Sequence, residues 1–404
     1  MNYIKPWLAA PVLLCFAASS CASGSSSSYE SFPSNSAPVS APVTPATTPV
    51  AAPVAVAAPV APAPASIAPK IMTAGEPTTV APGTVIDLSY WNITVPTDID
   101  KDGKPDTVKI PQISQVNHPD FFYVNSDGNV VFATPNKAQT TKNSSNTRSE
   151  LRHMSRGSNR KIKTKEYGNN FSVLAHPKSD KFAAVGGKLE ATLSVNHVAV
   201  NAGHPEKYPA YSAVVGQIHG VKEKNPPKGG GWGNEPIKIY YKKWPNHDTG
   251  SVFWTYERNL AKADPDRRDI AYPVWGNTWE NPADPGDKGI SLNEEFSYTI
   301  NVHENVMHLT FENARQGVVK QSIDLSNNVD VYGEVDEKDN PLGYTKDQLY
   351  FKAGIYNQCS TSDKEGFWYA ACPGTGVWSD DKANGDYAQS TFSKIELSSS
   401  TAPE

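Results

Sequence analysis

The stretch YFKAGIYNQ, residues 350–358, alternates polar and apolar side chains along its length. Successive side chains of a β-strand point to opposite faces of the sheet. Lys352, Tyr356 and Gln358 are therefore expected on one face, with Phe351 and Ile355 on the other. One apolar and one polar face is typical of a strand in an antiparallel sheet that covers a core on one side. The stretch predicts a strand of this kind.

Two further stretches, RSELR at 148–152 and QIH at 217–219, show the same alternation. Their polar members on the predicted outward face are Arg148, Glu150, Arg152, Gln217 and His219. If the three strands lie side by side, they present a largely cationic surface with one imidazole and one phenol. Such a surface suits an acidic polymer, and it carries groups that can move protons.

Runs of the same type recur from residue 83 to residue 398, and clusters of Gly, Pro, Asn and Asp separate them. No long segment has the 3.6-residue period of an amphipathic helix. We therefore predict an all-β fold, an antiparallel β-sandwich of the jelly-roll type, for one domain over 83–398. The length would also accommodate two domains, but no second linker interrupts this region.

The first 82 residues differ in composition from the rest of the chain. Residues 1–20 are typical of an export signal, with Lys5 followed by an apolar run from 7 to 18. Cys21 follows small residues and is expected either to carry a lipid or to be lost with the signal. Residues 21–82 are rich in Ser, Ala and Pro and predict a disordered tether. We expect an exported protein, either secreted or tethered to the outer membrane through that lipid.

The net charge of −5 gives no global attraction for nucleic acid. Cys359 and Cys372 are the two cysteines of the predicted domain. In an exported protein they most simply form one disulfide, and two buried free thiols are the alternative. We expect a monomer that touches a membrane only through a lipid at Cys21.

The three alternating stretches together resemble the alginate lyases of polysaccharide lyase family 7. Each stretch matches a sequence signature of that family completely, and the three occur in the family's order. The opening segment 87–96 is also similar to the family's first strand. The resemblance covers 85–397 and implies a jelly roll whose concave sheet forms the substrate cleft. It implies His219 and Tyr356 as proton-transfer groups, with Arg148 and Gln217 facing the substrate carboxylate. The further residues expected to bind substrate are Glu150, Arg152, Lys352, Asn357 and Gln358.

Alginate is a polyuronate, and its β-elimination removes the C5 proton and expels the sugar linked at O4, which leaves a 4,5-unsaturated end. The adjacent carboxylate must be neutralised for that proton to leave, which Arg148 and Gln217 could do. Tyr356 is expected to act as both base and acid on mannuronate, and positive neighbours would stabilise its phenolate. On guluronate His219 is expected to take the proton. Ile218 weakly favours guluronate-containing polymer, and we expect endolytic cleavage.

Two alternatives remain open: a lyase for another polyuronate such as glucuronan, and a non-catalytic polyuronate-binding module. No cofactor is expected to be required. The segment 98–103 resembles half of a calcium loop, and a structural Ca²⁺ near Asp98–Asp102 is weakly supported against a plain polar turn. The insertions that follow Arg152 and His219 are either mobile lids or ordinary surface loops.

Overall fold

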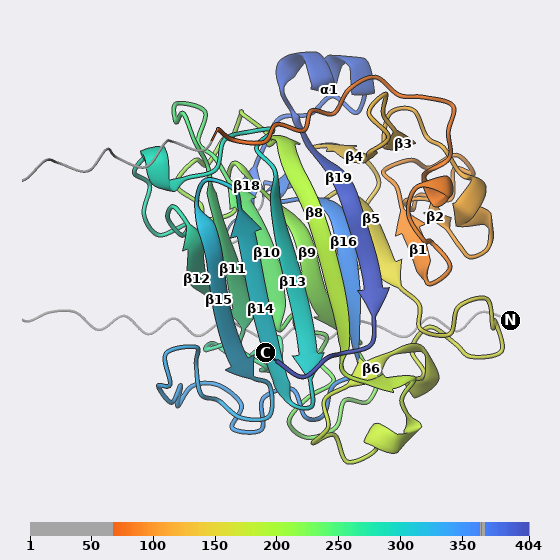
Figure 1. Ribbon diagram of the computed structural model, residues 1–404, viewed down its shortest axis with the longest axis vertical. Helices are drawn as coiled ribbons and strands as arrows, with labels where there is room; N and C mark the ends of the chain where they lie inside the picture. The colour runs from red at the N-terminus through yellow and green to blue at the C-terminus, as the bar shows by residue number, and fades with distance from the viewer. Residues whose placement is uncertain (1–67, 364, 366–367, 404) are drawn as a thin grey trace, which may run out of the picture. The chain divides into compact units, whose positions relative to one another are not determined.

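Two antiparallel β-sheets face each other in the computed structural model (Figure 1), which describes residues 68–363, 365 and 368–403. The predicted all-β jelly-roll sandwich is confirmed. The expected signal segment 1–20, Cys21 and the tether as far as residue 67 lie outside the described residues. In the part that the structure describes, no helix is long and apolar enough to cross a membrane.

The first sheet holds the three alternating stretches. Among the described residues it has ten strands, whose main order is β12-β11-β10-β9-β16-β5-β1-β2, with β6 and β7 off this path. Their bounds are β1 Trp91–Thr94, β2 Thr107–Val108, β5 Arg148–His153, β6 Phe171–Ser172, β7 Ala184–Val185, β9 Ser212–Gly220, β10 Ile237–Lys242, β11 Ser251–Glu257, β12 Asp269–Trp275 and β16 Leu349–Asn357.

The second sheet has seven strands within the described ranges, in the order β15-β14-β13-β8-β19-β4-β3. Their bounds are β3 Phe122–Val124, β4 Val130–Pro135, β8 Gly187–His197, β13 Phe296–His303, β14 Val306–Asn313, β15 Gly317–Asp324 and β19 Tyr387–Ser398. The remaining elements are the pair β17 Cys359–Ser360 and β18 Ala370–Ala371, the helix α1 Trp378–Asn384, and short 3-10 turns at Pro82–Thr84, Gln112–Gln115, Tyr167–Asn169, Ser179–Lys181 and Gly286–Lys288.

The main core lies between the sheets and receives the apolar members of the alternating stretches. Leu151, Ile218 and Ile355 are fully buried there, and Phe351 is nearly so. Because side chains alternate along a strand, this burial turns the polar members of the same strands to the outer face of the first sheet. The hydrophobic pattern thus fixes which residues can form a site.

One irregularity in β16 shapes that outer face. Lys352 pairs with Gln217 of β9, but the register shifts between Ala353 and Tyr356, so that Tyr356 pairs with Val214. Gly354 lies inside this bulge with a φ of +127°, and a Cβ at that position would lie 2.6 Å from the Ser149 carbonyl oxygen. Only glycine fits both this backbone conformation and the close approach of β5.

The folded region begins earlier than the predicted boundary at residue 83. Met72 is buried, and its amide donates to the Asn293 carbonyl oxygen at 2.8 Å. Pro77 bridges to Asn125, and the Thr78 amide donates to Val124. Composition alone assigned this segment to the tether, but its backbone groups find partners on the sandwich, which offset the entropy of ordering it.

The predicted disulfide between Cys359 and Cys372 is confirmed, with a Cα–Cα distance of 5.6 Å. It closes the loop that directly follows β16, and its two ends form the pair β17–β18. Ala370 and Ala371 are therefore held next to the end of the strand that carries Tyr356.

Candidate active site

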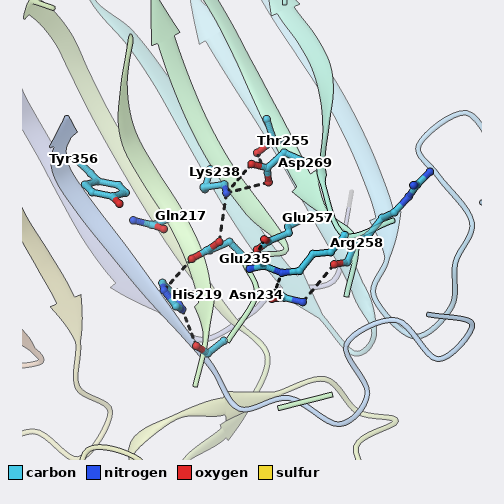
Figure 2. Close-up of polar contacts among 12 residues, drawn as sticks. Gln217, His219, Asn234, Glu235, Lys238, Thr255, Glu257, Arg258, Asp269 and Tyr356 are labelled. Atoms are coloured by element: carbon cyan, nitrogen blue, oxygen red, sulfur yellow. Dashed lines mark hydrogen bonds and ion pairs between the residues drawn. The ribbon is translucent and has the colours of Figure 1, made fainter. Parts of the chain in front are cut away.

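Strand pairing brings the predicted site residues together on the outer face of the first sheet. Lys352 in β16 lies between Gln217 of β9 and Arg152 of β5. Tyr356 pairs with Arg148, and the Arg148 guanidinium carbon lies 4.0 Å from the centre of the Tyr356 ring. Gln217, His219 and Tyr356 follow one another along this face in Figure 2. The phenol, guanidinium, amide and imidazole therefore occupy three neighbouring strands.

Glu150 is the hub of this group and is only 3% exposed. Its carboxylate accepts a hydrogen bond from Arg148 Nη1 at 3.0 Å, and it also contacts Lys352 Nζ and Gln217 Nε2. Burial acts to raise the pKa of Glu150, but the charges of Lys352 and Arg148 outweigh it and hold the pKa below its usual value. Burial also lowers the pKa of Lys352 to about 8. Glu150 thus orients three donors and is itself covered from a substrate.

The phenol oxygen of Tyr356 has polar neighbours. It lies 3.0 Å from Ser144 Oγ, which in turn accepts a hydrogen bond from Arg148 Nη2 at 3.0 Å. The hydroxyl of the half-buried Tyr369 is hydrogen-bonded to Tyr356 as well. These contacts fix the position of the phenol, and the Arg148 guanidinium places a positive charge beside its ring. The sequence does not predict these contacts of Ser144 and Tyr369, because only the fold brings the two residues to Tyr356.

The Arg148 guanidinium is already partly engaged. Its Nη1 and Nη2 atoms donate to Glu150 and Ser144, while its buried Nε has no hydrogen-bond partner among the described residues. Its fork is therefore fixed by the protein, which sets the plane in which it can meet a carboxylate.

Both ring nitrogens of His219 face acceptors. Nδ1 lies 2.6 Å from the Gly220 carbonyl oxygen, and Nε2 lies 2.9 Å from Glu235 Oε1. The ring also stacks on Tyr350 at a centroid distance of 5.3 Å. These two contacts fix the orientation of the imidazole ring.

Glu235 is the functional residue that sequence reasoning missed. Figure 2 shows it between His219 and Lys238, whose ammonium lies 3.3 Å from Glu235 Oε2 and 2.9 Å from Asp269. Burial acts to raise the pKa of Glu235, but Lys238 and His219 hold it well below the usual value. The pairing of Ile237 with Ile218 puts Glu235 beside the end of β9. That cross-strand position, which the sequence alone does not show, was the missing signal.

Three residues expected to bind substrate have other partners. Asn357 is fully buried, and its amide donates to Asn136 at 2.8 Å on the side opposite to Tyr356, so this expectation is wrong. Gln358 is 1% exposed, and its amide donates to the Tyr356 carbonyl oxygen at 3.3 Å. Arg152 lies 3.8 Å from the Tyr350 ring centre and donates to the His153 carbonyl oxygen at 3.0 Å. These side chains support the site from beneath or beside it.

The two insertions that follow Arg152 and His219 meet each other. Lys165 Nζ donates to the Lys222 carbonyl oxygen at 2.9 Å, and Gln348, just before β16, donates to Glu223 at 2.8 Å. The insertions therefore lie together at one end of the three site strands. Whether they move as lids stays a prediction.

The carboxylates of Asp98, Asp100 and Asp102 lie within 4.8 Å of one another. Two of them are also engaged by their own loop, since Lys104 Nζ lies 2.6 Å from Asp102 and the Gly103 amide donates to Asp98. Oxygen ligands of this type suit Ca²⁺. The calcium site stays a prediction.

Comparison with known proteins places this fold and site in one class, the polysaccharide lyases. A family model described as alginate lyase matches residues 86–399. An alginate lyase of Klebsiella pneumoniae is 33% identical over 326 residues, which cover 78% of this chain and 90% of that protein. The chain belongs to the alginate lyases of polysaccharide lyase family 7.

Two solved structures are similar over the same region. The crystal structure of the Klebsiella pneumoniae alginate lyase has a TM-score of 0.61 and 29% identity, and covers 80% of this chain and 99% of its own. An exolytic family 7 alginate lyase from Zobellia galactanivorans has a TM-score of 0.62 and 32% identity, with the same coverage.

Proposed function

We propose that this alginate lyase cleaves its polymer by β-elimination and that Tyr356 is its central proton-transfer group. One observation carries the proposal: Tyr356 lies against Arg148, which a buried Glu150 joins to Gln217 and Lys352. The positive groups neutralise the substrate carboxylate, so that the C5 proton becomes acidic enough to leave. The phenolate takes that proton, and the resulting phenol can return it to O4.

The two uronates make different demands on the site. In mannuronate the C5 proton and O4 lie on the same side of the ring, so Tyr356 serves both. In guluronate they lie on opposite sides, and His219 takes the proton while Tyr356 protonates O4. To take that proton, His219 Nδ1 would turn from the Gly220 carbonyl oxygen to the sugar, while Nε2 keeps its contact with Glu235. We retain the preference for guluronate-containing polymer that Ile218 suggests.

The test follows the absorbance of the new C4–C5 double bond on polymannuronate, polyguluronate and glucuronan. We expect product from the two alginate polymers and none from glucuronan. Tyr356→Phe should lower kcat by on the order of 10²–10⁴ on both. His219→Ala should cause a loss of this size on polyguluronate and a smaller one on polymannuronate. Loss below tenfold in both variants on both polymers would refute these roles, and binding without cleavage by the unmodified protein would favour a binding module.

We propose endolytic cleavage, as expected from the sequence, with exolytic release as the second candidate because the relative from Zobellia galactanivorans is described as exolytic. Product sizes during the first few per cent of the reaction separate the two. A broad range of oligosaccharides supports endolytic action, whereas accumulation of a single short product from the start supports exolytic action.

We also propose that the protein is exported and acts as a monomer, with a lipid on Cys21 as its attachment to the outer membrane. In cells that express the full chain, Cys21→Ser should move the enzyme from the membrane fraction to the soluble fraction. Sedimentation of the purified Cys21→Ser protein should give the mass of one chain.

A further inference from the structure

Three aromatic side chains form a cluster on the outer face of the first sheet, which we call the aromatic platform: Tyr208, Trp279 and Trp368. The rings of Tyr208 and Trp279 are nearly parallel, with centroids 5.6 Å apart. Trp368 stands edge-on to both, at 5.8 Å from Tyr208 and 5.6 Å from Trp279. Tyr208 is 40% exposed and Trp368 is 45% exposed, whereas Trp279 is 4% exposed and supports them from below.

The platform is continuous with the site rather than with the main core. Trp279 stands edge-on to Tyr240 of β10 at 5.2 Å and to Phe253 of β11 at 5.5 Å. These rings form a hydrophobic cluster separate from the core between the sheets, and Tyr356 packs against that cluster. A continuous hydrophobic cluster therefore connects Tyr356 to Trp279, on which the exposed rings of Tyr208 and Trp368 pack.

Two further contacts tie the platform to the site. Trp368 directly precedes Tyr369, whose hydroxyl is hydrogen-bonded to Tyr356. Lys207, next to Tyr208, has its ammonium 3.3 Å from the Tyr369 carbonyl oxygen, which leaves further donors of this ammonium for an anion. A positive charge thus lies beside Tyr369, which follows the exposed Trp368 and is hydrogen-bonded to Tyr356.

We propose that the aromatic platform is a binding subsite for a uronate residue of the polymer beyond the residues that react. This inference rests on the proposed function. A pyranose ring presents a face of C–H groups, and its burial against an aromatic ring removes apolar surface from water. The carboxylate of the same residue would meet Lys207. Exposed rings that are continuous with a functional site are where such an apolar contact is expected.

The test measures steady-state kinetics of the full chain on alginate polymer and on the shortest oligosaccharide that the unmodified enzyme cleaves. Tyr208→Ala and Trp368→Ala should each raise KM for the polymer about tenfold. Neither should change kcat, nor kcat/KM for the shortest oligosaccharide. Trp368→Phe should keep most of the affinity for the polymer, because an aromatic face remains at this position. Lys207→Gln should raise KM for the polymer at low salt and lose this effect at high salt.

Tyr332→Ala is the matched control. Tyr332 is 68% exposed, but it packs on Tyr272, which belongs to the core between the sheets. An unchanged KM for the polymer in both platform variants would overturn the inference, as would equal losses on the polymer and on the shortest oligosaccharide. The proposed function fails separately, if the unmodified enzyme forms no unsaturated product from either alginate polymer.

Discussion

The side chains of the site act as linked pairs more than as single groups. Arg148 is held by Glu150 and Ser144, and His219 is held by Gly220 and Glu235. Each partner restricts the orientation of a group that must meet the substrate, and this restriction is how a protein prepares charge for a transition state. Removal of a partner should therefore affect turnover even where the partner does not touch the sugar.

At this scale Glu235→Gln tests the coupling to His219. The amide can still meet Nε2 but is uncharged and a far weaker acceptor, so the negative charge beside the ring is lost. We expect kcat on polyguluronate to fall by about tenfold, with little change on polymannuronate, where Tyr356 alone moves the proton. Asp269→Asn, which touches Lys238 but not His219, is the control. Equal losses on both polymers would show that Glu235 has only a structural role.

Arg148→Lys tests the guanidinium fork. One ammonium cannot hold Glu150 and Ser144 and also remain beside the Tyr356 ring, although it keeps the charge. We expect kcat/KM on either alginate polymer to fall by at least tenfold. The free energy of unfolding should change little, because Glu150 keeps the positive charges of Lys352 and of the new lysine. Activity equal to that of the unmodified enzyme would contradict the role given to the fork.

At the scale of elements, β16 is the strand on which the site depends. It pairs with β5 on one side and β9 on the other, and it ends in the disulfide loop. Its bulge at Gly354 fixes where Tyr356 emerges relative to Val214. A change of this backbone is therefore expected to disturb both stability and the site.

Gly354→Ala should destabilise the protein by about 1–3 kcal/mol, because its φ is +127° and the added Cβ would meet the Ser149 carbonyl oxygen. Denaturant unfolding measures this loss. Gly128→Ala is the control, since Gly128 also has a positive φ, +80°, but open space around it. Similar losses in the two variants would mean that backbone conformation alone, and not the approach of β5, requires glycine at 354.

The disulfide loop gives a second prediction at this scale. The cysteines are 13 residues apart, and the paired replacement Cys359→Ser with Cys372→Ser should lower the free energy of unfolding by about 3 kcal/mol. The loop also carries Tyr369, whose hydroxyl is hydrogen-bonded to Tyr356, so turnover should fall even at temperatures where the variant remains folded. Full activity in that folded variant would show that other contacts place the loop.

For the whole molecule, buried histidines predict a loss of stability in acid. His153 packs between Trp91 and Phe351, and burial, with Arg152 next to it, lowers its pKa from 6.5 to about 3. Burial also lowers the pKa of His176 to about 4. Because these values lie below those of the unfolded chain, the unfolded state binds more protons, and stability falls as pH decreases from about 6.5 toward these values.

His153→Phe removes one of the two groups that bind an extra proton in the unfolded state. The slope of the unfolding free energy against pH should become shallower by about one proton between pH 6 and pH 4. A His153→Phe slope equal to that of the unmodified protein would show that His153 does not govern acid stability.

The sequence by itself determined the sandwich and the polar face, because alternation of side chains along a strand needs no knowledge of distant contacts. Only the tertiary structure decided that Glu235 meets His219 and that Ser144 meets Tyr356, since these residues are far apart in the chain or lie outside any regular pattern. It also decided that the segment around Met72 belongs to the fold, because the partners that satisfy its backbone come from remote strands and loops.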